Sequence, residues 1–318
     1  NVTLSTQTQV NAFVNDSNCK YTAITGNLIL DGSHATDPIT NLCNLSELQE
    51  VGGTLTIRRF TNPNNPTNLN DLGKLETING NLTIGGSIAN SNSSLTVINL
   101  PHLEKVGGNI SITQNTAVTS INIPTPFVDI TASLSVRNNG ASSLSSVVVG
   151  VKEVAGSVAI QSNGNVLATL SLPELQKVGR HLDMNNTTGS NSVSATAAVS
   201  LPKLTETGGR FHLVRAAYTL SAPMLTDVGT DTTLVAANRA FTLQFGGGGI
   251  VSMDDAVPAL AYVGGNLVVS NNPELGKCCV IPCKLTHING NDAPFTSALN
   301  ANPPGVSISN NKPYASGG

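Results

Sequence analysis

The sequence predicts an all-β protein built as a parallel solenoid, in which each repeat forms one coil. The main observation is the recurring phrase L-x-x-L-x-x-V-G-G-x-L-x-I, found at residues 45–57 (LSELQEVGGTLTI), 72–84 (LGKLETINGNLTI) and 100–112 (LPHLEKVGGNISI). Weaker copies continue to residue 269, and the equivalent positions recur at intervals of 21 to 35 residues. Such a repeat indicates stacked coils joined by loops of different length.

Each repeat ends in a short segment in which apolar and polar residues alternate, such as TLTI at 54–57 and NLTI at 81–84. A period of two predicts a strand with Leu55 and Ile57 inside and Thr54 and Thr56 outside. The Gly-Gly pairs at 52/53, 107/108, 208/209 and 264/265 precede such strands, and they permit either positive φ or close backbone packing at a corner. The Asn-rich segments that follow strands, such as 62–68 and 90–94, are predicted to be outer loops.

Composition supports one solenoid domain. Although 318 residues would suffice for two globular domains, no linker interrupts the repeat. Hydrophobic residues make up 39% of the chain, aromatic residues only 3%, and Trp is absent, so the core must consist of rows of Leu, Ile and Val. We expect a solenoid over residues 1–311, with an N-terminal cap at 1–23, repeats at 24–270 and a C-terminal cap at 271–311. Residues 312–318 are expected to be a tail or linker.

Short helices are expected to cap both ends, because the end of a solenoid exposes unpaired strand edges and apolar rows. At the N-terminus, Ser5 or Thr6 is a candidate N-cap, followed by Val10 and Phe13 at helical spacing. At the C-terminus, Asp292 is the expected N-cap of a closing helix. A last strand is predicted near residues 306–311.

Charge argues against two classes of partner. Only 11% of the residues are charged, the net charge is -3 and no basic run occurs, which excludes a typical nucleic-acid-binding protein. No segment approaches the roughly 20 consecutive apolar residues that a membrane-spanning helix needs, so no membrane insertion is expected. The surface must be covered largely by Ser, Thr, Asn and Gly.

The five cysteines lie near the two ends of the chain, at Cys19, Cys43, Cys278, Cys279 and Cys283. Cys19 and Cys43 are 24 residues apart, about one repeat, and are predicted to form a disulfide. In the C-terminal cap we assign Cys279 and Cys283 as a pair, although the pairing among the three cysteines there stays open. The alternative is a zinc site with His287 as the fourth ligand. Disulfides at both ends predict an oxidising, extracytoplasmic compartment.

The repeat unit resembles that of receptor L domains, which also occur in fungal cell-wall proteins and in secreted bacterial surface proteins. The segments ITGNLIL at 24–30 and NNPELGKCC at 271–279 are similar to the bacterial, Bacteroidetes-type version. The resemblance covers roughly residues 1 to 311. It implies a right-handed parallel β-helix that is secreted and lies at the cell surface. The cysteine-rich modules of receptor ectodomains are not visible in this sequence, so growth-factor binding is not implied.

The outward positions of the strands are predicted to form a polar column, which is the candidate binding face. Its residues are Thr54, Thr56, Asn81, Thr83, Asn109, Ser111, His181, Asp183, Arg210 and His212. Such a column can simply keep the solenoid soluble, or it can bind glycans or a partner surface through regularly spaced donors and acceptors. Ice binding would require a regular Thr-x-Thr ladder, and only Thr54 and Thr56 provide one. The charged rungs at 181, 183, 210 and 212 are a further candidate for a metal or carboxylate-ligand site.

Catalysis is not expected. Polysaccharide lyases and hydrolases need paired carboxylates or a Ca²⁺ cluster, and the adjacent acidic pair here, Asp254 and Asp255, is expected in a loop. The sequence contains no G-x-S-x-G, H-E-x-x-H or P-loop motif. We therefore expect a non-catalytic, cofactor-free secreted module for adhesion or structural display that binds glycan, matrix or surface protein. The alternatives are a self-assembling subunit of a surface layer or filament, or binding to ice or mineral.

Overall fold

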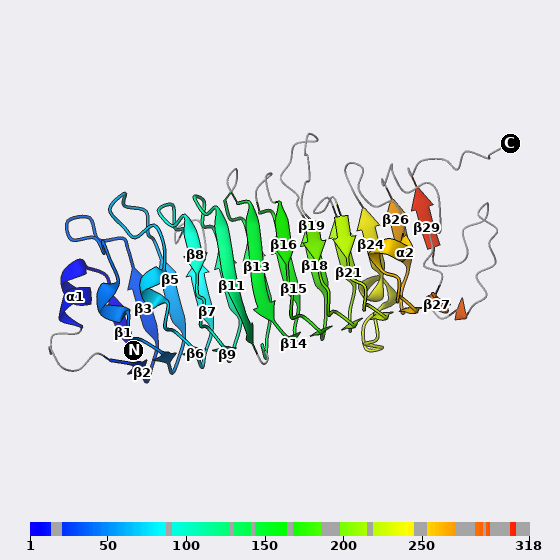
Figure 1. Ribbon diagram of the computed structural model, residues 1–318, viewed down its shortest axis with the longest axis horizontal. Helices are drawn as coiled ribbons and strands as arrows, with labels where there is room; N and C mark the ends of the chain where they lie inside the picture. The colour runs from blue at the N-terminus through cyan, green and yellow to red at the C-terminus, as the bar shows by residue number, and fades with distance from the viewer. Residues whose placement is uncertain are drawn as a thin grey trace. The chain divides into compact units, whose positions relative to one another are not determined.

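A computed structural model confirms the parallel β-solenoid (Figure 1). It describes residues 1–13, 21–86, 91–127, 130–140, 144–163, 168–185, 198–214, 219–244, 253–270, 284–288, 291–292 and 306–309. The chain divides into two compact units, which are described separately. Unit 1 comprises Asn1–Val154 with Ser162–Leu167, and unit 2 comprises Ala155–Gln161 with Ala168–Gly318. The single domain over residues 1–311, with its caps, stays a prediction.

Unit 1 is built from parallel strands that belong to three sheets. The long sheet contains β1 (Val2–Leu4), β3 (Leu28–Asp31), β5 (Leu55–Arg58), β7 (Leu82–Gly85), β10 (Ile110–Thr113) and β12 (Leu134–Arg137). The second sheet contains β8 (Val97–Asn99), β11 (Ser120–Phe127) and β13 (Ser146–Val151). The third sheet contains β2 (Ala23–Ile24), β4 (Glu50–Val51), β6 (Thr77–Ile78) and β9 (Lys105–Val106), and single bridges through Ile130 lead to β14 (Glu153–Val154).

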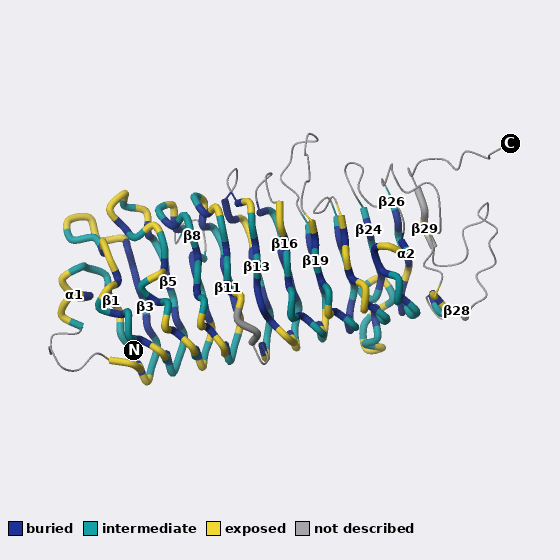
Figure 2. The backbone as a smooth tube through the Cα atoms, in the orientation of Figure 1, coloured by how far each residue is buried: buried dark blue, intermediate teal, exposed yellow. Residues whose placement is uncertain are grey.

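The core of unit 1 is a set of stacked aliphatic rows, as the alternating pattern predicts. Leu55 pairs with Leu82, and Leu82 with Ile110, so equivalent inward residues lie one above another. All three side chains are fully buried. Buried and half-buried residues alternate along the strands, whereas exposed residues gather at the turns (Figure 2). The inward and outward assignment of the strands is therefore confirmed.

A second buried column in unit 1 consists of asparagines, one of which, Asn92, lies in a segment predicted to be an outer loop. Its members are Asn92, Asn115, Asn139 and Asn163. Nδ2 of each of the first three donates to the Oδ1 of the next asparagine at 2.8 to 3.0 Å, and Nδ2 of Asn163 donates to the carbonyl of Val136 at 2.6 Å. Nδ2 of Asn139 also donates to the carbonyl of Ile112 at 2.8 Å, and its Oδ1 accepts the backbone N–H of Asn115 at 3.1 Å. The assignment of residues 90–94 to an outer loop is wrong for Asn92, because its amide satisfies backbone groups that the turn leaves unpaired.

The asparagine column is possible because the chain bends sharply at the end of each strand. The residue before three of the asparagines has positive φ, at 60° for Gln114 and 54° for both Asn138 and Ser162. This conformation turns the following side chain back toward the interior. In an earlier coil Arg59 has the same conformation, with φ of 57°, and the next residue, Phe60, is fully buried.

Unit 2 repeats the same plan. Its long sheet contains β15 (Val158–Gln161), β18 (Leu182–Asn185), β21 (Phe211–Val214), β24 (Phe241–Gln244), β26 (Leu267–Ser270) and β29 (Val306–Ser309). Its second sheet contains β16 (Thr169–Ser171), β19 (Ala198–Ser200) and β22 (Thr219–Ser221). Its third sheet contains β17 (Lys177–Val178), β20 (Glu206–Thr207), β23 (Asp227–Val228), β25 (Tyr262–Val263), β27 (His287–Ile288) and the antiparallel β28 (Asn291–Asp292). The inward Phe211 and Phe241 stack at 5.0 Å between ring centroids.

The first glycine of each Gly-Gly pair packs against the backbone of the preceding coil. A Cβ atom at Gly52 would lie 2.5 Å from the carbonyl oxygen of Thr25, and Gly107 similarly faces that of Asn79. None of the eight glycines in these pairs has positive φ. Close packing, rather than the left-handed conformation, is therefore the reason for glycine at these corners.

The predicted N-terminal helix is present as α1 (Gln7–Ala12), and Thr6 is its N-cap. Thr6 Oγ1 accepts the N–H of Gln9, whose side chain accepts the N–H of Thr6, which forms a capping box. The segment expected to be a cap also contains β1, which already pairs with β3.

At the C-terminal end, the last predicted strand is present as β29. The predicted N-cap role of Asp292 is not observed, because this residue belongs to β28, which pairs with β27 in the antiparallel direction. The remainder of the predicted closing helix lies outside the described residues. The pair Asp254 and Asp255, expected in a loop, lies in the short helix α2 (Met253–Ala256).

Candidate functional site

Unit 1 presents a neutral polar surface on the outside of its long sheet, here called the hydroxyl face. The outward strand residues are in register: Thr56 pairs with Thr83, Thr83 with Ser111, and Ser111 with Ser135. These four side chains are half-buried. Because the strands are held at about 4.8 Å spacing, the hydroxyl groups form a regular row on a rigid support. The sequence-predicted column is therefore brought together within unit 1.

A second row of the hydroxyl face lies just before the strands and ties successive coils together. Oδ1 of Asn27 accepts the N–H of Thr54 at 2.8 Å, and Oγ1 of Thr54 accepts the N–H of Asn81 at 3.2 Å. Oδ1 of Asn81 then accepts the N–H of Asn109 at 2.7 Å. These side-chain oxygens therefore have a structural role, which the sequence analysis did not assign to them.

Arginines border the hydroxyl face at the ends of its strands. Unit 1 contains three arginines, Arg58, Arg59 and Arg137, which we call the arginine edge. Arg58 is the last residue of β5 and Arg137 the last residue of β12. Arg137 pairs with Thr113 on β10, and Thr113 pairs with Gly85 on β7. Gly85 follows Ile84 just as Arg58 follows Ile57, and Ile84 pairs with Ile57. All three arginines therefore lie along the same edge of the sheet.

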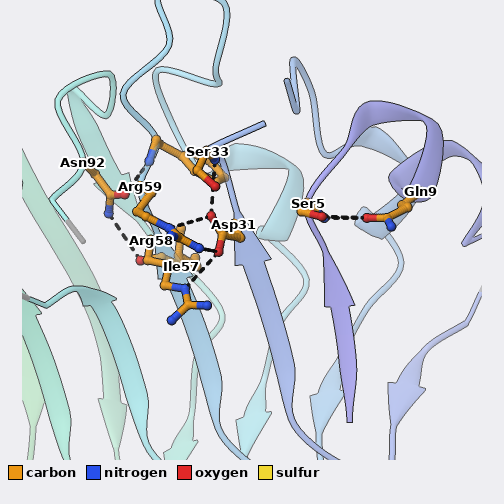
Figure 3. Close-up of polar contacts among 9 residues, drawn as sticks. Ser5, Gln9, Asp31, Ser33, Ile57, Arg58, Arg59 and Asn92 are labelled. Carbon is orange, nitrogen blue, oxygen red and sulfur yellow. Dashed lines mark hydrogen bonds and ion pairs between the residues drawn. The ribbon is translucent and has the colours of Figure 1, made fainter. Parts of the chain in front are cut away.

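A buried carboxylate holds two of these arginines. Asp31, only 3% exposed, accepts from Nε of Arg58 at 3.1 Å and from Nε of Arg59 at 2.9 Å. Nη2 of Arg59 and the N–H of Ser33 also donate to it (Figure 3). Burial raises the pKa of Asp31, but the hydrogen bonds from Arg59 and Ser33 outweigh burial and hold it below its usual value. The Asp31 carboxylate thus accepts hydrogen bonds from both guanidinium groups and fixes their positions.

Sequence reasoning missed the arginine edge. The signal that would have found it is positional, because Asp31 and Arg58 occupy equivalent strand-end positions in adjacent coils and pair directly. Only an alignment extended one residue beyond each apolar strand brings an aspartate beside an arginine. The repeat phrase ends at Ile57, one residue before Arg58.

In unit 2 the predicted charged rungs do come together. Asp183 pairs with His212 on the neighbouring strand. Oδ1 and Oδ2 of Asp183 accept from Nε and Nη2 of Arg210 at 2.7 and 3.0 Å, and Nδ1 of His212 lies 3.6 Å from Oδ1. His181 Nδ1 accepts the backbone N–H of Arg210 at 3.3 Å.

Asp183 occupies the predicted outward position, but it is only 7% exposed beside Arg210 and His212. Burial raises the pKa of Asp183, but the His212 imidazole and the Arg210 guanidinium lower it to about 2. Burial, followed by the charge of Arg210, lowers the pKa of His181. The cluster is therefore an ion pair between Asp183 and Arg210, with the imidazoles of His181 and His212 beside it.

The metal hypotheses gain no support from the described residues. No group of three or more His, Cys, Asp or Glu side chains there is arranged to hold a metal ion. Of the zinc candidates, Cys278, Cys279 and Cys283 lie outside the described part, while His287 stacks on Tyr262 at 4.8 Å between ring centroids. Cys43 is exposed with a free thiol, and Cys19, its predicted partner, also lies outside the described part, so both disulfides stay predictions.

Comparison with known proteins adds no further assignment. No protein-family model, curated protein or solved structure matches the chain. Among the described residues, no helix has the length and apolar character needed to cross a membrane.

Proposed function

We propose that the protein is a non-catalytic, secreted surface module for adhesion or structural display, which binds glycan, matrix or surface protein through the hydroxyl face. The observation that carries the proposal is the in-register row of Thr56, Thr83, Ser111 and Ser135. Alternating with these residues along the strands are fully buried Leu, Ile and Val side chains, which hold the row in place. Binding of a ligand to this row therefore costs little side-chain entropy in the protein.

The chemistry of this face suits sugars and polar protein surfaces. Hydroxyl groups both donate and accept hydrogen bonds, as sugar hydroxyls do. Two carboxylates on the outer sides of the long sheets, Asp31 and Asp183, already accept from arginines, which supports a binding role over acid–base catalysis. Secretion is proposed from the resemblance of the repeat to extracellular L domains.

The proposal is tested by screening the full chain on a glycan array and an array of matrix proteins, together with two variants. The first, Thr56→Val/Thr83→Val/Ser111→Ala, removes the hydroxyls at nearly constant shape. The second, Ser120→Ala/Ser146→Ala, removes hydroxyls from outward positions of the second sheet of the same unit. We expect binding that the first variant loses and the second retains. Absence of any binding, or binding that the first variant leaves unchanged, would contradict the proposal.

Ice binding is the second candidate, and the same hydroxyl row favours it. Regularly spaced hydroxyls on a flat sheet are the feature that this function needs, although the row mixes Thr with Ser. Measurement of thermal hysteresis decides between the two, since an ice-binding face would lose its activity when Thr83 is replaced by Tyr. Filament formation, the remaining alternative, would show as concentration-dependent mass in analytical ultracentrifugation.

A further inference from the structure

We propose that the arginine edge of unit 1 binds the acidic groups of an anionic polysaccharide that lies across the hydroxyl face. This inference rests on the proposed function and adds the charge class of the ligand and the residues that recognise it. The hydroxyl groups would contact the neutral part of the sugar chain. Arg58 and Arg137 would contact carboxylate or sulfate groups.

Two of the cationic groups of the arginine edge are held in position by Asp31. Asp31 accepts from Nε of Arg58, so the two Nη atoms of Arg58 take no part in this contact (Figure 3). Arg59 uses both Nε and Nη2 on the same carboxylate. One buried negative charge thus orients two guanidinium groups, and a positive charge remains in excess. An arginine that is already oriented loses less side-chain entropy when it binds an anion.

Arg58 and Arg137 are spaced widely along the edge. Between Arg58 and Arg137 lie Gly85, which has no side chain, and Thr113, whose Oγ1 donates to the carbonyl of Gly86 at 3.0 Å. Arg137 is exposed, and no acidic side chain among the described residues forms an ion pair with it. The two arginines are three strands apart, about 14 Å at the usual strand spacing. A ligand that contacts both must therefore be extended and carry more than one acidic group.

The surroundings of the arginine edge are almost uncharged. Along the long sheet of unit 1, the described outward positions of the strands and of the residues just before them are otherwise uncharged, apart from Asp31. The protein as a whole has a net charge of -3, so the arginine edge is a positively charged region on a protein of negative net charge. A local excess of positive charge on a neutral hydroxyl surface fits an acidic polysaccharide, which has both hydroxyl and acidic groups.

Other anionic macromolecules fit less well. Nucleic acids are bound through many phosphate contacts and, for single strands, through aromatic stacking. The hydroxyl face offers two outward-facing cationic positions and no aromatic side chain among its described residues. An anionic membrane would also require more basic residues, or apolar side chains able to enter the lipid.

The test measures binding of the full chain to immobilised polygalacturonate, dextran sulfate and neutral dextran by biolayer interferometry at low ionic strength. We expect binding to at least one acidic polymer and not to dextran, and the two acidic polymers separate carboxylate from sulfate recognition. Binding should weaken as salt is added. Arg58→Gln and Arg137→Gln should each weaken binding about tenfold, the effect of losing a charge-assisted hydrogen bond.

Lys105→Gln and Lys152→Gln are the matched controls, because they remove the same charge from other exposed positions of unit 1 and should change the affinity less than about twofold. If Arg58→Gln disturbs Asp31, the affinity of Arg137→Gln decides whether the arginine edge binds the polymer, since Arg137 does not contact that carboxylate. Equal binding to dextran, equal losses in the lysine controls, or equal affinity for single-stranded DNA or phosphatidylserine vesicles would each overturn the inference. If neutral glycans bind the hydroxyl face and the arginine variants have no effect, the inference fails while the proposed function survives.

Discussion

The same residue type, asparagine, has two roles in this chain, and its neighbours decide which one it takes. Asn81 and Asn109 are exposed and accept backbone N–H groups from the next coil. Asn115 and Asn139 are fully buried and accept and donate inside the unit. The difference arises from the positive φ of the preceding residue, which turns the amide inward. Propensity alone assigns both pairs to loops.

The buried column should be sensitive to loss of a single amide. Asn139→Ala removes the donor to the Ile112 carbonyl and the acceptor for the Asn115 N–H, both of which are buried. We expect the free energy of unfolding to fall by about 3 to 5 kcal/mol. Asn122→Ala, which removes the half-buried bond to Asn99, should cost about 1 kcal/mol or less. Urea denaturation of both variants measures this, and equal losses would contradict the role assigned to the column.

A second expectation at this scale concerns pH. The pKa of Asp183 is lowered to about 2 by His212 and Arg210, which outweigh burial, and His181 lies beside the same arginine. A carboxyl group with a lowered pKa stabilises the folded state above its unfolded pKa of roughly 3.9, and this contribution is lost as the pH falls toward 2. We expect Asp183→Asn to be less stable than the unmodified protein by at most about 2 kcal/mol between pH 5 and 7. The difference should shrink between pH 4 and 2 when thermal unfolding is followed. A difference that grew on acidification would show that Asp183 does not act as an ionised acceptor.

At the scale of elements, the strands were predictable and the corners only partly so. In TLTI and NLTI, apolar and polar residues alternate at every position. The strands β5 and β7 follow this pattern. The corners depend on how closely one coil approaches the next. Gly107 occupies a corner position at which Asn79, Thr131 and Ala155 stand in other coils. The consensus sequence of one repeat therefore does not indicate at which corners glycine is required.

Replacement of a corner glycine tests this difference. A Cβ at Gly107 would collide with the carbonyl oxygen of Asn79, so Gly107→Ala should lower the free energy of unfolding by about 2 kcal/mol or more. The reverse change at the equivalent corner, Ala155→Gly, creates no collision and should cost about 1 kcal/mol or less through chain entropy. Urea midpoints of the two variants provide the comparison. If both changes cost the same, the corner is governed by entropy and not by close packing.

The candidate site was also only half predictable. Outward Thr and Ser follow directly from the alternation, and the structure places Thr56, Thr83 and Ser111 in one row. The arginine edge depends on register between coils 27 residues apart, and Asp31 stands where the other strands end in different residue types. The burial of Asp183 likewise depends on Arg210 in the next coil. Contacts between coils are thus the information that one repeat read alone does not contain.

At the scale of the whole molecule, the two compact units each have their own aliphatic rows and their own buried carboxylate paired with arginine, at Asp31 in unit 1 and at Asp183 in unit 2. Within a unit, each strand of the long sheet pairs only with the strands before and after it. Stability in such an array is approximately a sum of coil terms and nearest-neighbour terms. A local defect should therefore weaken the adjacent coils most and decline with distance along the unit.

Leu82→Ala tests this graded response. Leu82 is fully buried between Leu55 and Ile110, and its truncation should cost about 2 to 5 kcal/mol through lost burial and the cavity left behind. We expect native-state amide hydrogen exchange to accelerate most in β5, β7 and β10, and least in β1, at the far end of the same sheet. Thr83→Ala, on the outer side of the same strand, should leave exchange nearly unchanged. Uniform acceleration from β1 to β12 would mean that the coils of unit 1 unfold only together, because the coupling between neighbours then exceeds the cost of the defect.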